Sequence, residues 1–122
     1  MAKILIIEDE KALADMYKIE LERRGFEAIV AFEGEEGIEI AKKEKPDLIV
    51  LDLLLPRIQG IEALKILKQN SETKDIPVFI LTNYDTFEQR ANGENLGAEK
   101  YILKTSITPQ KVADLIEERL KK

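Results

Sequence analysis

Short runs of aliphatic residues recur along the chain, and stretches with apolar residues at helical spacing separate them. The runs with the pattern of β-strands lie at 3–7, 27–31, 47–52, 78–81 and 100–103. After each run, apolar residues three to four positions apart predict a helix, so five strands alternate with five helices. This alternation, with right-handed crossovers, predicts an α/β fold with a doubly wound parallel sheet.

Turn and cap residues mark the ends of these helices. Gly25 follows two arginines and stands where a residue in the left-handed conformation closes the first helix. Pro46 stops the second helix, because its ring disfavours helical geometry in Lys45. The later helices are predicted at 33–44, 61–69, 87–96 and from the capping pair Thr108-Pro109 onward.

The helix predicted at 87–96 has the weakest intrinsic preference. Asn92, Gly93 and Asn95 each lower helix propensity, by up to about 1 kcal/mol relative to Ala. We expect this helix to be the most mobile element.

The first and last helices have clearer faces: the helical pattern of the first comprises Leu13, Met16, Tyr17, Glu20 and Leu21, and the buried face of the last comprises Val112, Leu115, Ile116 and Ile107 or Leu120.

Asp52 is the one acidic residue within the apolar run 49–56. A carboxylate deep in hydrocarbon is costly unless it is paired or bound to metal, so we place Asp52 at the carboxyl end of the third strand. The alternative is a capping or turn aspartate before Pro56. In the flavodoxin-like strand order 2-1-3-4-5 the first and third strands are neighbours, which brings Glu8 and Asp9 beside Asp52.

Three ionised carboxylates cannot stay within a few ångströms of one another without a cation. Each close pair repels by about 4 kcal/mol at an effective dielectric constant near 20. The chain has no histidine and no cysteine, so a metal here is expected to be a hard, oxygen-bound ion. Mg²⁺ completed by phosphate oxygens fits this description. Glu10 is more simply explained as a first-turn helix charge.

Thr82 and Lys104 end the fourth and fifth strands, so they are predicted at the same sheet edge as Asp52. The Lys104 ammonium can neutralise phosphoryl oxygens or Asp52, and the Thr82 hydroxyl can donate to developing charge. Taken alone, Thr82 could be an ordinary strand-end turn residue and Lys104 a solvated cation. Their joint placement favours a functional constellation.

Composition sets the class of protein. The 122 residues predict one domain over 1–122. The absence of cysteine is compatible with a reducing cytosol, and we expect a cytoplasmic location. A balance of 19 basic and 24 acidic residues, interspersed along the chain, argues against direct nucleic-acid binding. No apolar run is long enough for membrane insertion.

The chain resembles the response-regulator receiver domains of two-component signalling, of the stand-alone chemotaxis type, over essentially its whole length. The matching residues occur in order at strand ends: Glu8-Asp9, Asp52 with Pro56 and Gly60, Thr82, Tyr101 and Lys104. The resemblance implies that Asp52 accepts a phosphoryl group from a histidine kinase or phosphotransfer protein. It also implies that Mg²⁺ is bound by Asp9, Asp52 and the backbone carbonyl of Leu54, with Glu8 acting largely through water.

The resemblance further implies a switch made of Thr82 and Tyr101. Thr82 would move to the new phosphoryl oxygen, the Tyr101 ring would turn inward, and the face made by the helix at 87–96, the strand at 100–103 and the last helix would change. This face would bind a downstream target, with a homodimer possible. Tyr101 could instead be a half-buried strand aromatic with a hydrated hydroxyl.

Four positions bear on how far the family pattern applies. Thr105 replaces the proline that usually follows the family lysine, so the bend at Lys104 can be trans. Asn83 replaces a small residue and could slow phosphoryl access. Leu54 and Tyr84 flank the expected phosphoryl position, and we expect them to exclude water and lengthen the phosphorylated state.

Two other classes of function remain as alternatives. A receiver-like adaptor would bind its partners without phosphorylation. A flavodoxin-like nucleotide enzyme would share the topology, but its phosphate loop needs glycine or hydroxyl residues with amide donors in place of Glu8-Asp9-Glu10. We therefore expect a signalling module that is not an enzyme beyond its own phosphotransfer and autodephosphorylation chemistry.

Overall fold

The five strands form one parallel sheet, as predicted. The computed structural model describes residues 1–83 and 87–121, of which residues 87–90 are described by their backbone alone. The sheet order is β2-β1-β3-β4-β5, and every neighbouring pair is parallel. The strands are β1 (Lys3–Ile7), β2 (Glu27–Ala31), β3 (Leu48–Leu51), β4 (Val78–Thr82) and β5 (Lys100–Leu103).

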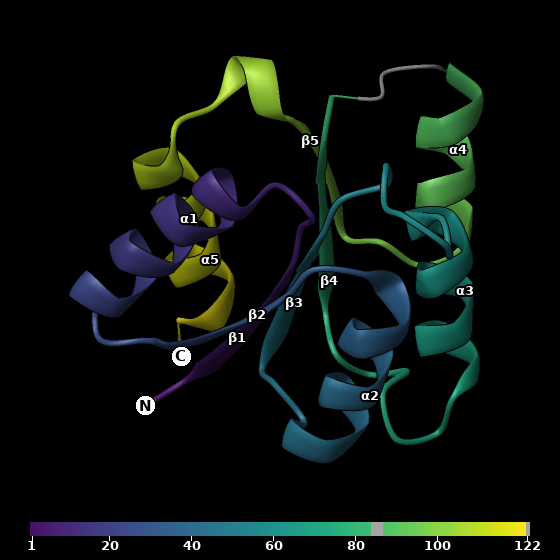
Figure 1. Ribbon diagram of the computed structural model, residues 1–122, viewed down its shortest axis with the longest axis horizontal. Helices are drawn as coiled ribbons and strands as arrows, with labels where there is room; N and C mark the ends of the chain where they lie inside the picture. Colours follow the sequence, from purple (N-terminus) through teal and green to yellow (C-terminus); the bar gives the residue numbers. More distant parts are fainter. Residues whose placement is uncertain (84–86, 122) are drawn as a thin grey trace.

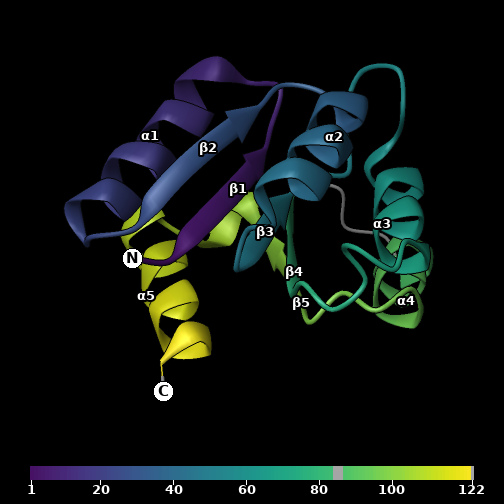
Figure 2. The ribbon, with the colours of Figure 1, turned by 90° about the horizontal axis from the view of Figure 1, so that it is seen from below.

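Helices cover both faces of this sheet (Figure 1). One layer holds α1 and α5, and the other holds α2, α3 and α4, an arrangement also seen from below in Figure 2. The bounds are α1 (Lys11–Arg23), α2 (Gly34–Glu44), α3 (Gly60–Gln69), α4 (Phe87–Asn95) and α5 (Pro109–Leu120), with a short 3₁₀ turn, η1, at Lys104–Ser106. The predicted flavodoxin-like fold class is confirmed.

The predicted boundaries hold to within one residue at most ends. The third strand is shorter than the predicted 47–52, because the chain turns at Asp52, whose side chain accepts a hydrogen bond from the Leu54 amide. Gly60 is already the first residue of α3. Gly25 has the predicted left-handed conformation, with φ of 92°. Lys45, which caps the end of α2 before Pro46, is also left-handed.

Two apolar clusters fill the space between the sheet and the helical layers. One lies under α2 and α3 and the other under α1 and α5. Tyr17 and Leu21 are buried as their spacing predicts, whereas Met16 is 50% exposed because it lies at the margin of the α1 face. In α5 the fully buried residues are Val112, Ala113 and Ile116, and Leu115, Leu120 and Ile107 are partly buried.

Gly93 has a packing role that helix propensity did not indicate. It is buried in α4, and a Cβ atom placed on it would lie 2.7 Å from Ile80 Cδ1 and 3.4 Å from Tyr101 Cδ2. A larger residue here would displace the end of the Ile80 side chain, so glycine favours the close packing of α4 on β4. Within the described residues, none of the helices has the length and apolar character needed to cross a bilayer.

Candidate functional site

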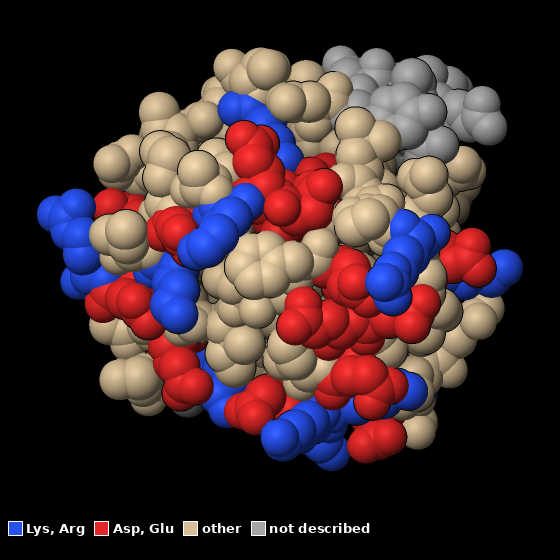
Figure 3. Space-filling model, in the orientation of Figure 1, with Lys and Arg blue, Asp and Glu red and all other residues tan. Residues whose placement is uncertain are grey.

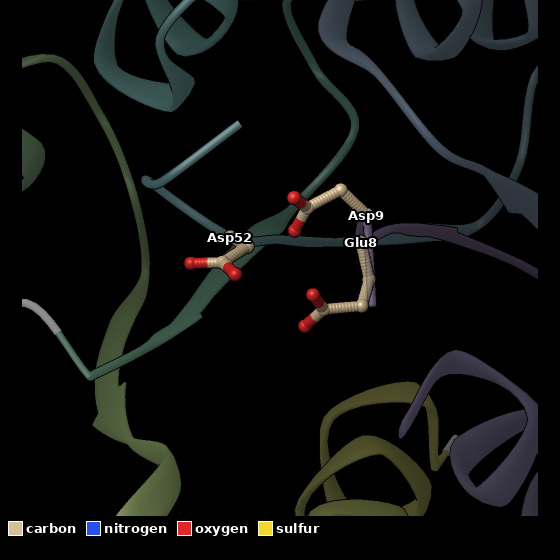
Figure 4. Close-up of side chains that lie close together, drawn as sticks. All are labelled: Glu8, Asp9 and Asp52. Atoms are coloured by element: carbon tan, nitrogen blue, oxygen red, sulfur yellow. The ribbon is translucent and has the colours of Figure 1, made fainter. Parts of the chain in front are cut away.

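Three carboxylates meet at the carboxyl ends of two neighbouring strands. Glu8 and Asp9 directly follow β1, Asp52 directly follows β3, and Ile7 is paired with Leu51 across the two strands. One oxygen from each carboxylate lies within 4.8 Å of the others. In Figure 4 the side chains of Glu8 and Asp9 extend from the end of β1 toward Asp52, which follows β3. Glu8 and Asp52 are buried and Asp9 is exposed, so the cluster opens to solvent on the side of Asp9.

Lys104 joins this cluster from the end of β5. Its Nζ lies 2.7 Å from Asp52 Oδ2 and 2.5 Å from Glu8 Oε1, and its side chain is only 11% exposed. The turn η1 begins at Lys104, and no described peptide bond is cis. The lysine therefore reaches Asp52 without the cis bend that a following proline would provide.

Burial and charge act on Glu8 in opposite directions. Burial raises the pKa of Glu8 to about 7, although hydrogen bonds from Lys104 and the Glu10 amide lower it, and the nearby Asp52 charge adds to the rise. For Lys104, burial lowers the pKa, but hydrogen bonds to Asp52 and Glu8 outweigh this and the net shift is upward. The ammonium therefore stays charged, and the site still has more acidic groups than it can neutralise.

The turn that carries Asp52 is fixed by close backbone packing. The Gly60 amide donates to the Leu53 carbonyl at 2.9 Å. A Cβ atom at Gly60 would lie 2.2 Å from the Asp52 carbonyl oxygen and 2.4 Å from Leu53 Cα. Asp52 Oδ1 accepts from the Leu54 amide at 3.2 Å, and the Leu54 side chain is 50% exposed. The position of the carboxylate thus depends on a glycine eight residues later in the chain.

The two candidate switch residues lie on neighbouring strands. Thr82 is the last residue of β4, is fully buried, and is paired in register with Leu103, the residue before Lys104. Tyr101 is partly buried against the cluster that contains Ile80. Asn83 is exposed, and Tyr84, which was predicted to flank the site, lies outside the described residues.

Sequence reasoning missed two features of the structure. It did not identify the ion pair of Glu8 with Lys104, because only the fold brings them together. It also did not indicate that Met16, a member of the predicted helical pattern, is 50% exposed and lines a shallow groove of about 200 Å³ together with the 60% exposed Ile19. The other residues of this groove are Glu20, Arg23, Pro109 and Gln110.

Acidic and basic side chains are mixed on one face of the molecule. On the face seen in Figure 3, basic side chains are scattered among groups of acidic ones. The chain as a whole carries a net charge of -5.

Comparison with known proteins identifies relatives over almost the whole chain. The family model "Response regulator receiver domain" matches residues 4–117. The alkaline phosphatase synthesis transcriptional regulatory protein PhoP of Bacillus subtilis is 41% identical over 102 residues, which are 84% of this chain and 42% of PhoP. The chain therefore spans less than half of that relative.

Solved structures show the same fold. The chemotaxis protein CheY4 of Vibrio cholerae superposes with a TM-score of 0.90 at 28% identity, covering 98% of this chain and 99% of CheY4. The Mn²⁺-bound response regulator Rcp1 superposes with a TM-score of 0.85 at 29% identity, covering 97% of this chain and 93% of Rcp1.

Proposed function

Because the chain belongs to the response-regulator receiver family, we propose that it acts by accepting a phosphoryl group on Asp52. A receiver domain is a signalling domain and not a catalytic enzyme in its own right, and we take residues 1–122 as one such domain. The observation that carries the proposal is the position of the Asp52 carboxylate, which has Asp9 and Glu8 on one side and the Lys104 ammonium at 2.7 Å.

The proposed reaction is an in-line transfer to an aspartyl oxygen. Asp52 forms a P–O bond as the P–N bond of a donor phosphohistidine breaks, and the leaving imidazole nitrogen keeps the bonding electron pair and takes a proton from solvent. Lys104 holds Oδ2, whereas among the described residues the hydrogen bond to Oδ1 comes from the Leu54 amide at 3.2 Å. Oδ1 is therefore the freer nucleophile, and the ammonium is placed to neutralise the transferred phosphoryl group.

The acidic residues fit a divalent metal. Carboxylate oxygens from Glu8, Asp9 and Asp52 form the hard donor set that Mg²⁺ prefers, and Mg²⁺ bound there would neutralise phosphoryl oxygens. We propose Asp9, Asp52 and the Leu54 carbonyl as its ligands. Glu8 is paired with Lys104 and would act through water. The Mn²⁺ of Rcp1 supports a divalent ion in this fold.

The phosphoryl donor must come from outside, because the chain has no histidine. We propose a histidine kinase or phosphotransfer protein, and the groove beside Met16 and Ile19 as part of its docking surface. The groove combines exposed apolar side chains with a position on α1, which begins two residues after Asp9. A donor protein whose phosphohistidine reaches Asp52 would also contact α1, where exposed apolar side chains can stabilise the complex.

The output is proposed to be a change of binding surface. Thr82 would bind the new phosphoryl group, Tyr101 would move, and the face of α4, β5 and α5 would change its affinity for a target protein or a second copy of the chain. Support comes from the placement of Thr82 next to β5 and of Tyr101 against Gly93 of α4. We propose a cytoplasmic protein that inserts into no membrane.

Nuclear magnetic resonance spectra of the amides test this proposal. Beryllofluoride, a phosphoryl mimic, is added with Mg²⁺ to the wild type and to Asp52→Asn. We expect shifts around Asp52, Thr82 and Tyr101 in the wild type and none in the variant. A wild type that shows no more beryllofluoride-induced shifts than Asp52→Asn would reject phosphorylation control and leave the phosphorylation-independent adaptor.

A further inference from the structure

Arg24, at the end of α1, binds four acceptors on two helices. Its Nε donates to Glu20 Oε2 at 2.9 Å within α1. Its Nη1 lies 2.6 Å from Asp114 Oδ1 and 2.7 Å from Glu117 Oε1, and its Nη2 donates to the Gln110 carbonyl at 3.1 Å, all in α5. The fixed planar fork of one guanidinium therefore connects the end of α1 to two successive turns of α5.

A second contact holds α5 near its carboxyl end. Arg119 makes a bidentate pair with Glu99, with nitrogen to oxygen distances of 2.6 and 3.0 Å. Glu99 precedes β5, and its amide donates to the Val78 carbonyl at 2.9 Å. Helix α5 is thus joined to α1 along two of its turns and, near its carboxyl end, to the start of β5.

Helix α4 has a different kind of attachment. Its described side chains, those of residues 91–95, form no ion pair with another element, and Gly93 packs closely on Ile80 and Tyr101. The Gly93 contacts are short-range and apolar, so a shift of this described part of α4 separates no ion pair. For α5 to shift against α1, several charge-assisted hydrogen bonds would have to break together.

We propose that the Arg24 contacts keep one part of the α4, β5 and α5 face constant on phosphorylation while another part changes. Helix α5 stays fixed to α1, and α4 together with Tyr101 carries the change on phosphorylation. The inference rests on the proposed function, because it concerns which half of the face responds. A partner would find the same α5 surface in both states and discriminate between them through α4.

Hydrogen exchange measured by mass spectrometry tests the division. The wild type, Arg24→Met and Arg23→Met are compared with and without beryllofluoride in the presence of Mg²⁺. Arg23 is the matched control: it is the neighbouring arginine, its side chain is 72% exposed, and it makes one 3.3 Å contact with Glu20. We expect beryllofluoride to change exchange severalfold in α4 and not in α5 of the wild type and of Arg23→Met.

In Arg24→Met we expect exchange in α5 to respond to beryllofluoride as well. Merely loosening α5 would raise its exchange equally in both states, so the difference between states is the informative quantity. A wild-type α5 that responds as strongly as α4, or an Arg24→Met protein that behaves like Arg23→Met, would overturn the inference. If no element of the wild type responds, the proposed function itself fails and the inference fails with it.

Discussion

Replacing Gly60 by alanine should displace the acceptor carboxylate. The new Cβ would lie 2.2 Å from the Asp52 carbonyl oxygen, whereas real Cβ contacts are essentially never shorter than 3.0 Å, so these atoms must separate by about 0.8 Å. Overpacking costs about 1 to 3 kcal/mol, offset by up to about 1 kcal/mol from the better helix propensity of alanine. A misplacement of about 1 Å can slow a positioned reaction about 100-fold.

The assay compares stability with the rate of phosphorylation by a small-molecule donor. Gly25→Ala is the control: Gly25 has φ of 92°, and nothing lies within 4 Å of its Cβ position, so only strain is added. We expect both variants to lose about 1 to 2 kcal/mol in urea unfolding. Only Gly60→Ala should be phosphorylated much more slowly. A wild-type rate in a destabilised Gly60→Ala protein would refute the link between this contact and Asp52.

Three further predictions concern Glu8, Leu54 and the groove beside Met16. The pKa of Glu8 is about 7 in the folded protein against an ordinary 4.5, so the proton on Glu8 stabilises the folded state; this contribution is complete below about pH 4.5 and is lost as the pH rises through 7. Relative to Glu8→Gln, the metal-free wild type should therefore lose about 2 to 3 kcal/mol of unfolding free energy between these pH values, measured by urea unfolding. Leu54→Asn should shorten the lifetime of the phosphorylated state by admitting water beside Asp52, which timed loss of phosphate from purified protein would show; an unchanged lifetime would contradict this. Replacing Met16 and Ile19 together by serine should slow transfer from a phosphohistidine protein and leave phosphorylation by a small donor unchanged; parallel losses with both donors would argue against docking in this groove.

The fold follows from local patterns that the sequence displays directly. The aliphatic runs and the stop signals at Gly25 and Pro46 predict the alternation of elements, and alternation restricts the topology. The acidic pair Glu8-Asp9 and the isolated Asp52 then fall at neighbouring strand ends. These predictions needed only the order of the elements and the rule that ligands bind at this sheet edge.

Other features depend on three-dimensional packing and left no local signal. The Arg24 guanidinium binds acceptors about ninety residues away in the chain, at separations of 86 to 93. Propensity alone made Gly93 a sign of a weak helix, whereas in the structure Gly93 is where α4 approaches Ile80 of β4 and Tyr101 of β5 closely. The exposure of Met16 depends on where α5 stops covering α1, which helical spacing does not specify.

The most direct test of the account is the mass and position of a phosphoryl adduct. The protein is incubated with Mg²⁺ and phosphoramidate, and intact-mass and peptide analysis follow. We predict one phosphoryl group on the peptide containing Asp52, formed only when Mg²⁺ is present and absent from Asp52→Asn. An adduct that persists in Asp52→Asn, or no adduct on the folded wild type, would contradict the claim that this acidic cluster with Lys104 is a phosphoryl-accepting site.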